Sequence, residues 1–173
     1  PYGDTPAPKV FGHVSPLDPQ VFATIDEYVA GLLAGERNGK YSPVEVAQWL
    51  DDLVERATAS LAGIRPGASD KGNAELRRAL IDIRLQLGMG RFFAAKLRSG
   101  ALYAIHQRSG DRGALEEAVR FYRRAREHWS RFAEEARTVY VPDITFGPLP
   151  HQRGHWLDRL PAMDAAIAAM EKA

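Results

Sequence analysis

The sequence predicts an all-α fold, an antiparallel helical bundle of about five helices organised around one long central helix hairpin. Two long segments, residues 73–108 and 115–139, carry apolar residues at alternating spacings of four and three, as a seam along one helix face does. A short turn at residues 109–113 joins them, and two matching seams across a short turn favour antiparallel packing.

The first seam is the natural spine of the bundle, because a helix of that length would reach about 50 Å at 1.5 Å per residue. Gly88, Gly90 and Gly100 interrupt it, each at a cost of about 1 kcal/mol relative to alanine, so we expect close helix approach or a bend there. The first seam consists of Leu76, Leu80, Ile83, Leu87, Gly90, Ala94, Leu97, Ala101 and Ala104, and the second of Ala118, Tyr122, Ala125, Trp129, Phe132, Ala136 and Val139.

The N-terminal region predicts an arm followed by a helix. Residues 1–17 hold four prolines and two glycines without helical periodicity, so we expect an extended arm or the end of a linker. Asp18 and Pro19 are a good helix start, since an acidic N-cap is followed by proline at the first position. Gly35 is the expected stop. Residues 18–173 are predicted to form one bundle domain.

The second helix has the clearest start in the chain. Ser42, Pro43 and Glu45 combine a capping hydroxyl, proline at the first position and a glutamate that completes a capping box. The loop at residues 63–72 is expected to end this helix. Its predicted inner stripe is Val46, Trp49, Leu50, Leu53, Val54, Ala57 and Leu61.

The second half of the chain predicts a capped long helix, a loop and a thin last helix. Asp111 or a neighbour is the expected cap of the segment from residue 115. Residues 141–154 predict a loop, and residues 158–161 a first turn that accommodates Pro161. Charged residues on the long helix form expected i,i+4 pairs, Glu116 with Arg120 and Glu127 with Arg131.

The composition excludes several classes of partner and site. Lys and Arg number 23 against 22 Asp and Glu, so neither nucleic acid nor an anionic membrane is an expected partner. The chain has no cysteine, which excludes disulfides and thiolate metal sites. No apolar run approaches the roughly 18 residues that span a bilayer.

The densest polar cluster lies at the end of the predicted loop at residues 141–154 and in the two residues after it, and we call residues 141–156 the late loop. His151, Arg153, His155 and Trp156 are the candidate residues for contact with a substrate or another domain. The two histidines have the i,i+4 spacing of helical metal ligands, but glycine and proline place them in a loop and no third ligand follows at a known interval. We therefore predict no metal and no cofactor, and interpret the cluster as side chains that pin the loop to the bundle.

The sequence predicts no catalytic residue. Asp51 and Asp52 are adjacent on a helix and point to different sides, and Asp82 is expected to pair with an arginine. No serine lies in a strand-to-helix elbow. Trp49 and Trp129, like Trp156, are predicted core residues because of their helical spacing, although an exposed tryptophan would be able to stack on a sugar ring.

Three short motifs carry a family resemblance. Residues 18–22 (DPQVF), 39–50 (GKYSPVEVAQWL) and 154–156 (GHW) resemble the helical C-terminal region of large bacterial carbohydrate-active proteins. In that group such a module follows a sugar-cleaving (β/α)-barrel with a hexosaminidase-like or α-glucuronidase-like layout. The resemblance spans the chain from about Leu17 onward and implies that catalytic carboxylates lie on a barrel preceding Pro1.

The resemblance implies a function. We expect a non-catalytic accessory module of a glycoside-hydrolase-like protein that buttresses the catalytic domain of the same parent and borders its carbohydrate cleft. It also implies export to the periplasm or the extracellular space. The two long seams favour the alternative, a free-standing helical domain for protein-protein interaction or self-association. A third interpretation is a self-contained enzyme or metal protein that uses His151 and His155.

Overall fold

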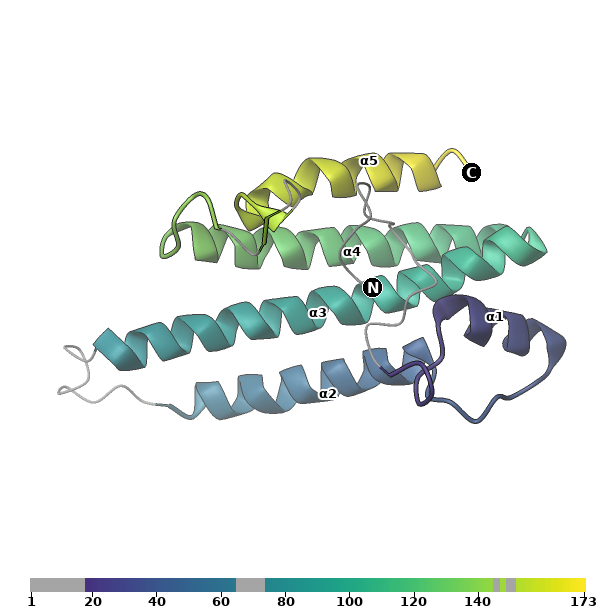
Figure 1. Cartoon of the computed structure of the whole chain (residues 1–173), viewed down its shortest axis with the longest axis horizontal. Coiled ribbons are helices and arrows are strands. Elements are labelled where there is room, and N and C mark those ends of the chain that lie inside the picture. The colour runs from purple at the N-terminus through teal and green to yellow at the C-terminus, as the bar shows by residue number, and fades with distance from the viewer. Residues whose placement is uncertain (1–17, 65–73, 145–146, 149–151) are drawn as a thin grey trace.

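The computed structural model describes residues 18–64, 74–144, 147–148 and 152–173, and over these residues every regular element is a helix. The predicted all-α bundle with a long central hairpin is confirmed (Figure 1). In that view α3 (Ala74–Ser109) runs through the middle, α1 (Ile25–Ala34) and α2 (Pro43–Ala62) lie below it, and α4 (Arg112–Arg137) and α5 (Leu160–Met170) lie above it. The predicted arm at residues 1–17 lies outside the described residues. Each described helix is too short or too polar to span a lipid bilayer.

The first helix, α1 (Ile25–Ala34), begins later than predicted. Residues 19–21 form a turn, and Phe22 then forms an isolated bridge with Tyr41: the Ala23 amide donates to the Tyr41 carbonyl at 2.9 Å, and the Tyr41 amide donates to the Val21 carbonyl at 3.0 Å. Thr24 then forms a full capping box with Glu27, which replaces the expected cap at Asp18. The predicted stop is confirmed, since Gly35 adopts the left-handed conformation with φ of 72°.

The second helix, α2 (Pro43–Ala62), has the predicted capping box between Ser42 and Glu45. Its predicted inner stripe is too wide. Val54 is buried against α3, whereas Trp49 is 41% exposed and Leu53 is 54% exposed. The prediction of Trp49 as a core residue is therefore wrong, because a helix that packs along one neighbour buries a narrower strip than its apolar residues cover.

The spine, α3 (Ala74–Ser109), contacts α1, α2 and α4 on different faces. Its predicted seam accounts for part of this packing: Leu87, Ala94, Ala101 and Ala104 are buried, and Ile83 is exposed. A second buried strip meets α4, and it consists of Leu85, Gly88, Phe92, Ala95 and Ser99. One seam read from the sequence thus divides into several contact faces in the bundle.

Two of the spine glycines allow the predicted close approach. A Cβ atom on Gly88 would lie 2.5 Å from the Cβ of Phe132 in α4, and one on Gly90 would lie 2.6 Å from the Cγ2 of Val54 in α2. Both distances are far shorter than carbon atoms tolerate. The absence of a side chain therefore sets the spacing between α3 and both neighbouring helices.

The hairpin partner, α4 (Arg112–Arg137), begins at the predicted cap, where the Asp111 carboxylate accepts from the Ala114 amide at 3.2 Å. The predicted pair of Glu127 with Arg131 is confirmed. Arg120 pairs with Glu117, three residues earlier, where Glu116 was expected; both spacings lie on one side of a helix.

The last helix, α5 (Leu160–Met170), packs on α4, and its Met163, Ile167 and Met170 belong to a buried cluster that also holds Phe92 and Ala95 of α3. Arg126 of α4 fixes it at the surface, with Nε and Nη2 donating to the Asp164 carboxylate at 2.8 and 3.0 Å. The 3-10 helix η3 (Trp156–Arg159) precedes α5, and Pro161 lies in the first turn of α5, where a proline is accommodated as predicted.

Candidate functional site

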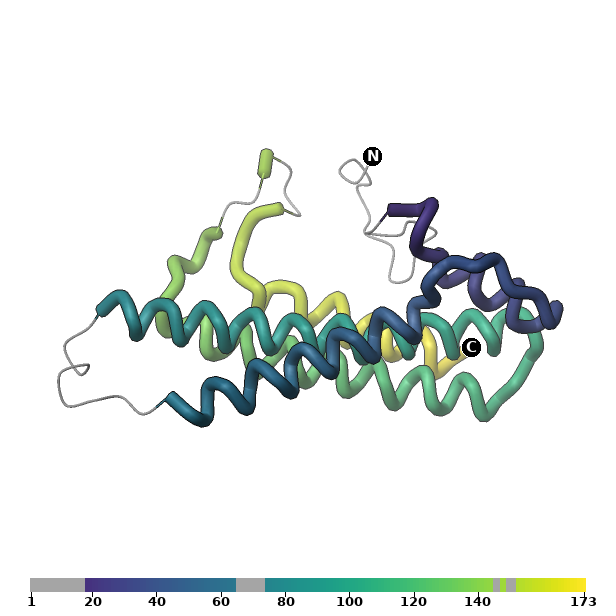
Figure 2. The backbone as a smooth tube through the Cα atoms, turned by 90° about the horizontal axis from the view of Figure 1, so that it is seen from below, coloured from purple at the N-terminus to yellow at the C-terminus, as the bar shows by residue number. Residues whose placement is uncertain are grey.

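The late loop leaves one side of the bundle and is closed at its base by Asp143. Figure 2 shows the described parts of the segment between α4 and η3 projecting from the flank of α3. The Asp143 carboxylate accepts from Arg153 Nη2 at 2.7 Å and from the Gly154 amide at 3.0 Å. Both contacts hold the pKa of Asp143 below its ordinary value, and the bond from Arg153 contributes most to this shift. The Ile144 amide adds a bond to the Gly154 carbonyl at 3.1 Å.

Gly154 makes the turn from this loop into η3. Its φ is 93°, and an added Cβ atom would lie 2.5 Å from Asp158 Oδ2. That carboxylate is held in place because it accepts the His155 amide at 2.6 Å. A residue with a side chain would therefore meet both backbone strain and a steric clash at this position.

His155 lies inside the protein and caps η3. Its side chain is 7% exposed, and Nδ1 accepts from the Leu157 amide at 3.2 Å. This acceptor role assigns the ring proton to Nε2. The Nε2 atom is buried and finds no acceptor among the residues that the structure describes.

Trp156 joins the loop to the core. Its ring contacts Tyr140 and Phe132, with centroid distances of 5.4 and 6.1 Å, and its carbonyl accepts from Trp129 Nε1 at 2.7 Å. The hydroxyl of Tyr140 donates to Asp82 at 2.6 Å, which raises the pKa of Tyr140. Asp82 thus has Tyr140 as a partner, whereas the sequence predicted an arginine.

The candidate residues have different environments. Arg153 is exposed, Trp156 is half-buried and His155 is buried, whereas His151 lies outside the described residues. Within the described part of the chain, no three potential ligand side chains gather closely enough to hold a metal ion. The observed bonds of Arg153 and His155 tie the loop together, and the substrate or domain contact assigned to this cluster stays a prediction.

Sequence reasoning missed an aromatic group at the corner of α1 and α2. Tyr41 and Trp49 have ring centroids 4.8 Å apart in an edge arrangement, and Phe22 packs beside them. Both Tyr41 and Trp49 are more than one-third exposed. The sequence feature that could have indicated this aromatic group is the motif around the Ser42 cap, because it places Tyr41 directly before α2 and Trp49 two turns into it.

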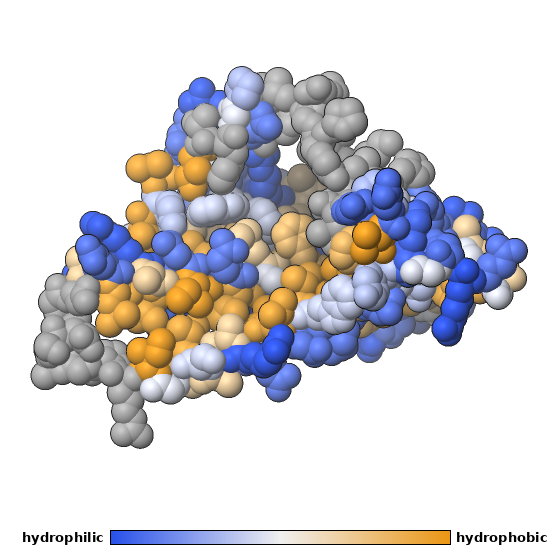
Figure 3. Space-filling model, turned by 60° about the horizontal axis from the view of Figure 1, so that its bottom comes forward, coloured by the Kyte–Doolittle hydropathy of each residue, from blue (hydrophilic) through white to orange (hydrophobic). Residues whose placement is uncertain are grey.

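Large apolar side chains gather on one face of the bundle. Figure 3 shows hydrophobic residues over a continuous area of the face turned to the viewer, with hydrophilic residues around it. Among the exposed large hydrophobic residues of α2, of α3 and of residues 139–141 are Trp49, Leu53, Ile83, Phe93, Val139, Tyr140 and Val141, which we call the apolar face. Contiguous exposed apolar surface is uncommon on a protein without a partner.

No family model and no curated protein matches this chain. Among solved structures, it is similar to a GH138 enzyme that targets the pectin rhamnogalacturonan II. The TM-score is 0.65 at 14% sequence identity, and the match covers 86% of this chain and 23% of the enzyme chain. This similarity concerns the fold, and the chain corresponds to less than one quarter of the length of that glycoside hydrolase.

Proposed function

We propose that this chain is a non-catalytic helical module of a carbohydrate-active protein, which buttresses a catalytic domain of the same polypeptide and borders its carbohydrate cleft. The observation that carries the proposal is the apolar face. Leu53 and Phe93 stand on neighbouring helices, and each is about half exposed. Burial of such side chains contributes about 25 cal/mol per Å² of apolar area, which is the driving force for domain docking.

The fold similarity supports the carbohydrate connection. A helical unit with a similar fold occupies part of a much longer glycoside hydrolase chain. If the rest of a longer polypeptide covers one side of such a module, that contact would bury an apolar face of this kind.

The environments of the carboxylates support a non-catalytic role. Asp51 pairs with Arg98 at 2.6 Å, Asp82 accepts from Tyr140, and Asp143 pairs with Arg153. Glycoside hydrolysis uses two carboxylates that flank one bond, with one of them raised in pKa. Asp143 has a lowered pKa, the opposite of what a general acid needs.

The late loop is the part of the module that we assign to the cleft border. Arg153 is exposed at its base, and His155 and Trp156 beneath it fix the loop on the bundle. Arg153, tied to Asp143 close to Tyr140 and Val141 of the apolar face, would be presented toward the neighbouring domain, whereas His151 lies outside the described residues.

The apolar face also favours the second candidate, a free-standing interaction domain that associates with itself. Sedimentation velocity of the chain separates the two. Concentration-dependent dimerisation that is abolished by Leu53→Glu favours self-association, whereas a monomer over the whole concentration range favours the module.

The experiment for the module uses the complete open reading frame that contains this sequence. The remaining part of that polypeptide is expressed separately and titrated with this chain. We expect saturable binding that Leu53→Glu and Phe93→Glu each weaken at least about tenfold, the equivalent of 1.4 kcal/mol. Glu116→Lys on the exposed side of α4 is the matched control and should leave the affinity unchanged. An open reading frame without further domains, or binding insensitive to both substitutions, would refute the proposal.

A further inference from the structure

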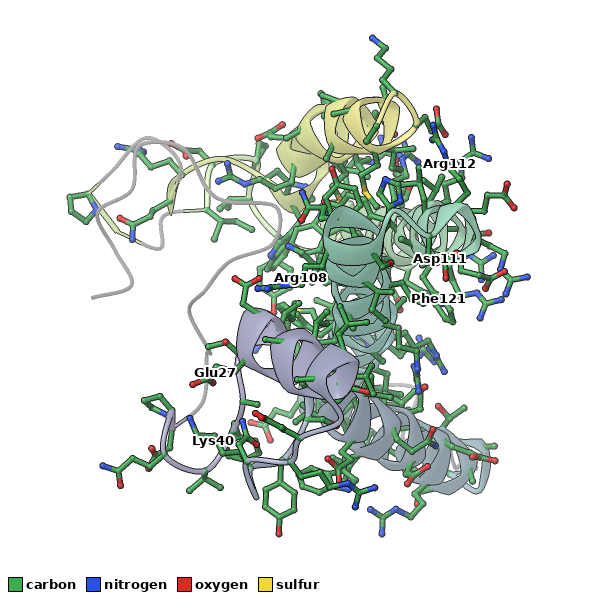
Figure 4. The ribbon with its side chains drawn as sticks, turned by 90° about the vertical axis from the view of Figure 1, so that its right-hand side faces the viewer. Glu27, Lys40, Arg108, Asp111, Arg112 and Phe121 are labelled. Atoms are coloured by element: carbon green, nitrogen blue, oxygen red, sulfur yellow. The ribbon has the colours of Figure 1, made fainter. Side chains whose placement is uncertain are left out.

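A groove separate from the apolar face runs between α2 and α4, with α3 as its floor. The groove is open to solvent along its length, and its volume of about 590 Å³ lies within the roughly 300–1,000 Å³ range of small-molecule sites. Its lining includes Glu55 and Thr58 of α2, Arg91 of α3, and Phe121 and Arg124 of α4. Figure 4 looks along the bundle and shows Phe121 on the side opposite to the late loop.

Two guanidinium groups in this groove have few partners. Arg91 donates to the Thr58 hydroxyl at 3.0 Å, and the Arg124 guanidinium lies 5.6 Å from the centre of the Phe121 ring. Neither forms an ion pair with a carboxylate among the described residues. A third arginine, Arg98, is held by Asp51 at 2.6 Å. Each guanidinium carries five N–H donors, so Arg91 and Arg124 keep most of theirs for a ligand.

His128 reports the electrostatic character of the groove that it lines. Burial is the main cause that lowers its pKa, and the positive charges of Arg91, Arg131 and Arg124 lower it further, whereas Glu127 acts in the opposite direction. The histidine is therefore surrounded by excess positive charge, the environment that an anion would neutralise.

We propose that this groove binds the carboxylates of an acidic oligosaccharide. The arginines supply charge-assisted, bidentate donors for a carboxylate. The α2 wall supplies acceptors, Glu55 and the Thr58 hydroxyl, which suit sugar hydroxyl donors. A polyacidic peptide fits less well, because its side chains bring carboxylates without the hydroxyl donors that Glu55 and Thr58 would accept. The choice of a sugar rests on the proposed function, and the anion site itself rests on the groove.

The test titrates the whole chain with a trisaccharide of α-1,4-linked galacturonate, followed by calorimetry at low ionic strength. We expect saturable binding, and none by galactotriose, which lacks the carboxylates. Arg91→Gln and Arg124→Gln should each weaken binding about tenfold or more, since one charge-assisted hydrogen bond contributes about 1.5–3 kcal/mol. Arg120→Gln is the matched control, because Arg120 also lies over Phe121, at 6.0 Å, but pairs with Glu117 and does not line the groove.

A second readout is the ionisation of His128, followed by NMR. A bound carboxylate stabilises the imidazolium, so the pKa of His128 should rise when the galacturonate trisaccharide binds. By linkage, the affinity then increases as the pH falls through that range. The charged groups that bear on this ring or share its groove are Asp51 and Glu55 of α2, Arg91 and Arg98 of α3, and Arg124, Glu127 and Arg131 of α4.

Three results would overturn the proposal: no saturable binding of the trisaccharide, binding unchanged by Arg91→Gln and Arg124→Gln, or equally tight binding of poly-L-glutamate, which would indicate an acidic peptide partner. The outcome is separable from that of the domain-docking experiment, because the groove and the apolar face use different residues. Docking with no sugar binding refutes the groove alone, and sugar binding with no docking refutes the docking alone.

Discussion

Alanine at Gly88 should destabilise the bundle although alanine is the better helix former. The substitution gains about 1 kcal/mol of helix propensity. Its Cβ atom, however, would stand 2.5 Å from Phe132 Cβ and 3.1 Å from Phe132 Cγ, where contact requires about 3.5–4.0 Å. No rotation of Phe132 moves its own Cβ, so α3 and α4 must separate by about 1 Å at this level.

That separation loosens a cluster of buried side chains around Phe132, which includes Leu85 and Ala136 and is completed by Trp129 and Trp156. Overpacking costs about 1–3 kcal/mol and more where nothing can rotate away. We therefore expect Gly88→Ala to lower the free energy of unfolding by about 2 kcal/mol net, and the melting temperature by about 5 °C.

Gly90→Ala is the matched comparison. Its Cβ would meet Val54 Cγ2 at 2.6 Å, a methyl group that rotation about χ1 moves away at the cost of leaving the rotamer that valine prefers in a helix. We expect Gly90→Ala to leave the free energy of unfolding nearly unchanged in the wild-type chain. In the Val54→Ala background, where that methyl group is absent, Gly90→Ala should raise the free energy of unfolding by up to about 1 kcal/mol. Urea denaturation of Gly88→Ala, Gly90→Ala, Val54→Ala and the Gly90→Ala/Val54→Ala double variant provides the measurement. If Gly88→Ala proves as stable as Gly90→Ala, the inference that glycine sets the α3 to α4 spacing is wrong.

Three further predictions follow from single side chains. The fully buried Ser99 hydroxyl donates to the Ala118 carbonyl at 2.7 Å, so Ser99→Ala should lower the free energy of unfolding by about 1 kcal/mol, and wild-type stability in urea would contradict this contact. Trp49 is exposed, so acrylamide should quench it most readily of the tryptophans, and Trp49→Phe should remove the most accessible component of the fluorescence. Burial and Arg91 hold the pKa of His128 below its ordinary value of 6.5, so protonation favours the unfolded chain. The free energy of unfolding should therefore fall as the pH drops below 6.5, and His128→Gln should show a shallower decline.

The late loop illustrates how far local sequence leads toward the candidate site. The cluster of Arg153, His155 and Trp156 was visible as a run of polar and aromatic residues around a glycine. Its expected role in fixing the loop agrees with the His155 cap and the Asp143 to Arg153 pair. The link from Tyr140 to Asp82 joins residues 58 positions apart, and no local pattern encodes such a contact.

The sequence by itself determined the helices and most of their ends. Apolar periodicity predicted the hairpin, and the capping groups at Ser42 and Asp111 fixed helix starts, because a cap satisfies backbone amides within one turn. The start of α1 was missed for a tertiary reason, since the backbone bridge between Phe22 and Tyr41 keeps Phe22 and Ala23 out of the helix.

Only the tertiary structure decided which apolar residues are buried and which charges remain unpaired. Periodicity defines a face of a helix, but the number of neighbours on that face depends on how all the helices pack. For that reason Trp49 and Leu53 belong to an exposed apolar face, and Arg91 and Arg124, distant in sequence, meet in one groove. The surfaces to which we assign function are products of helix packing.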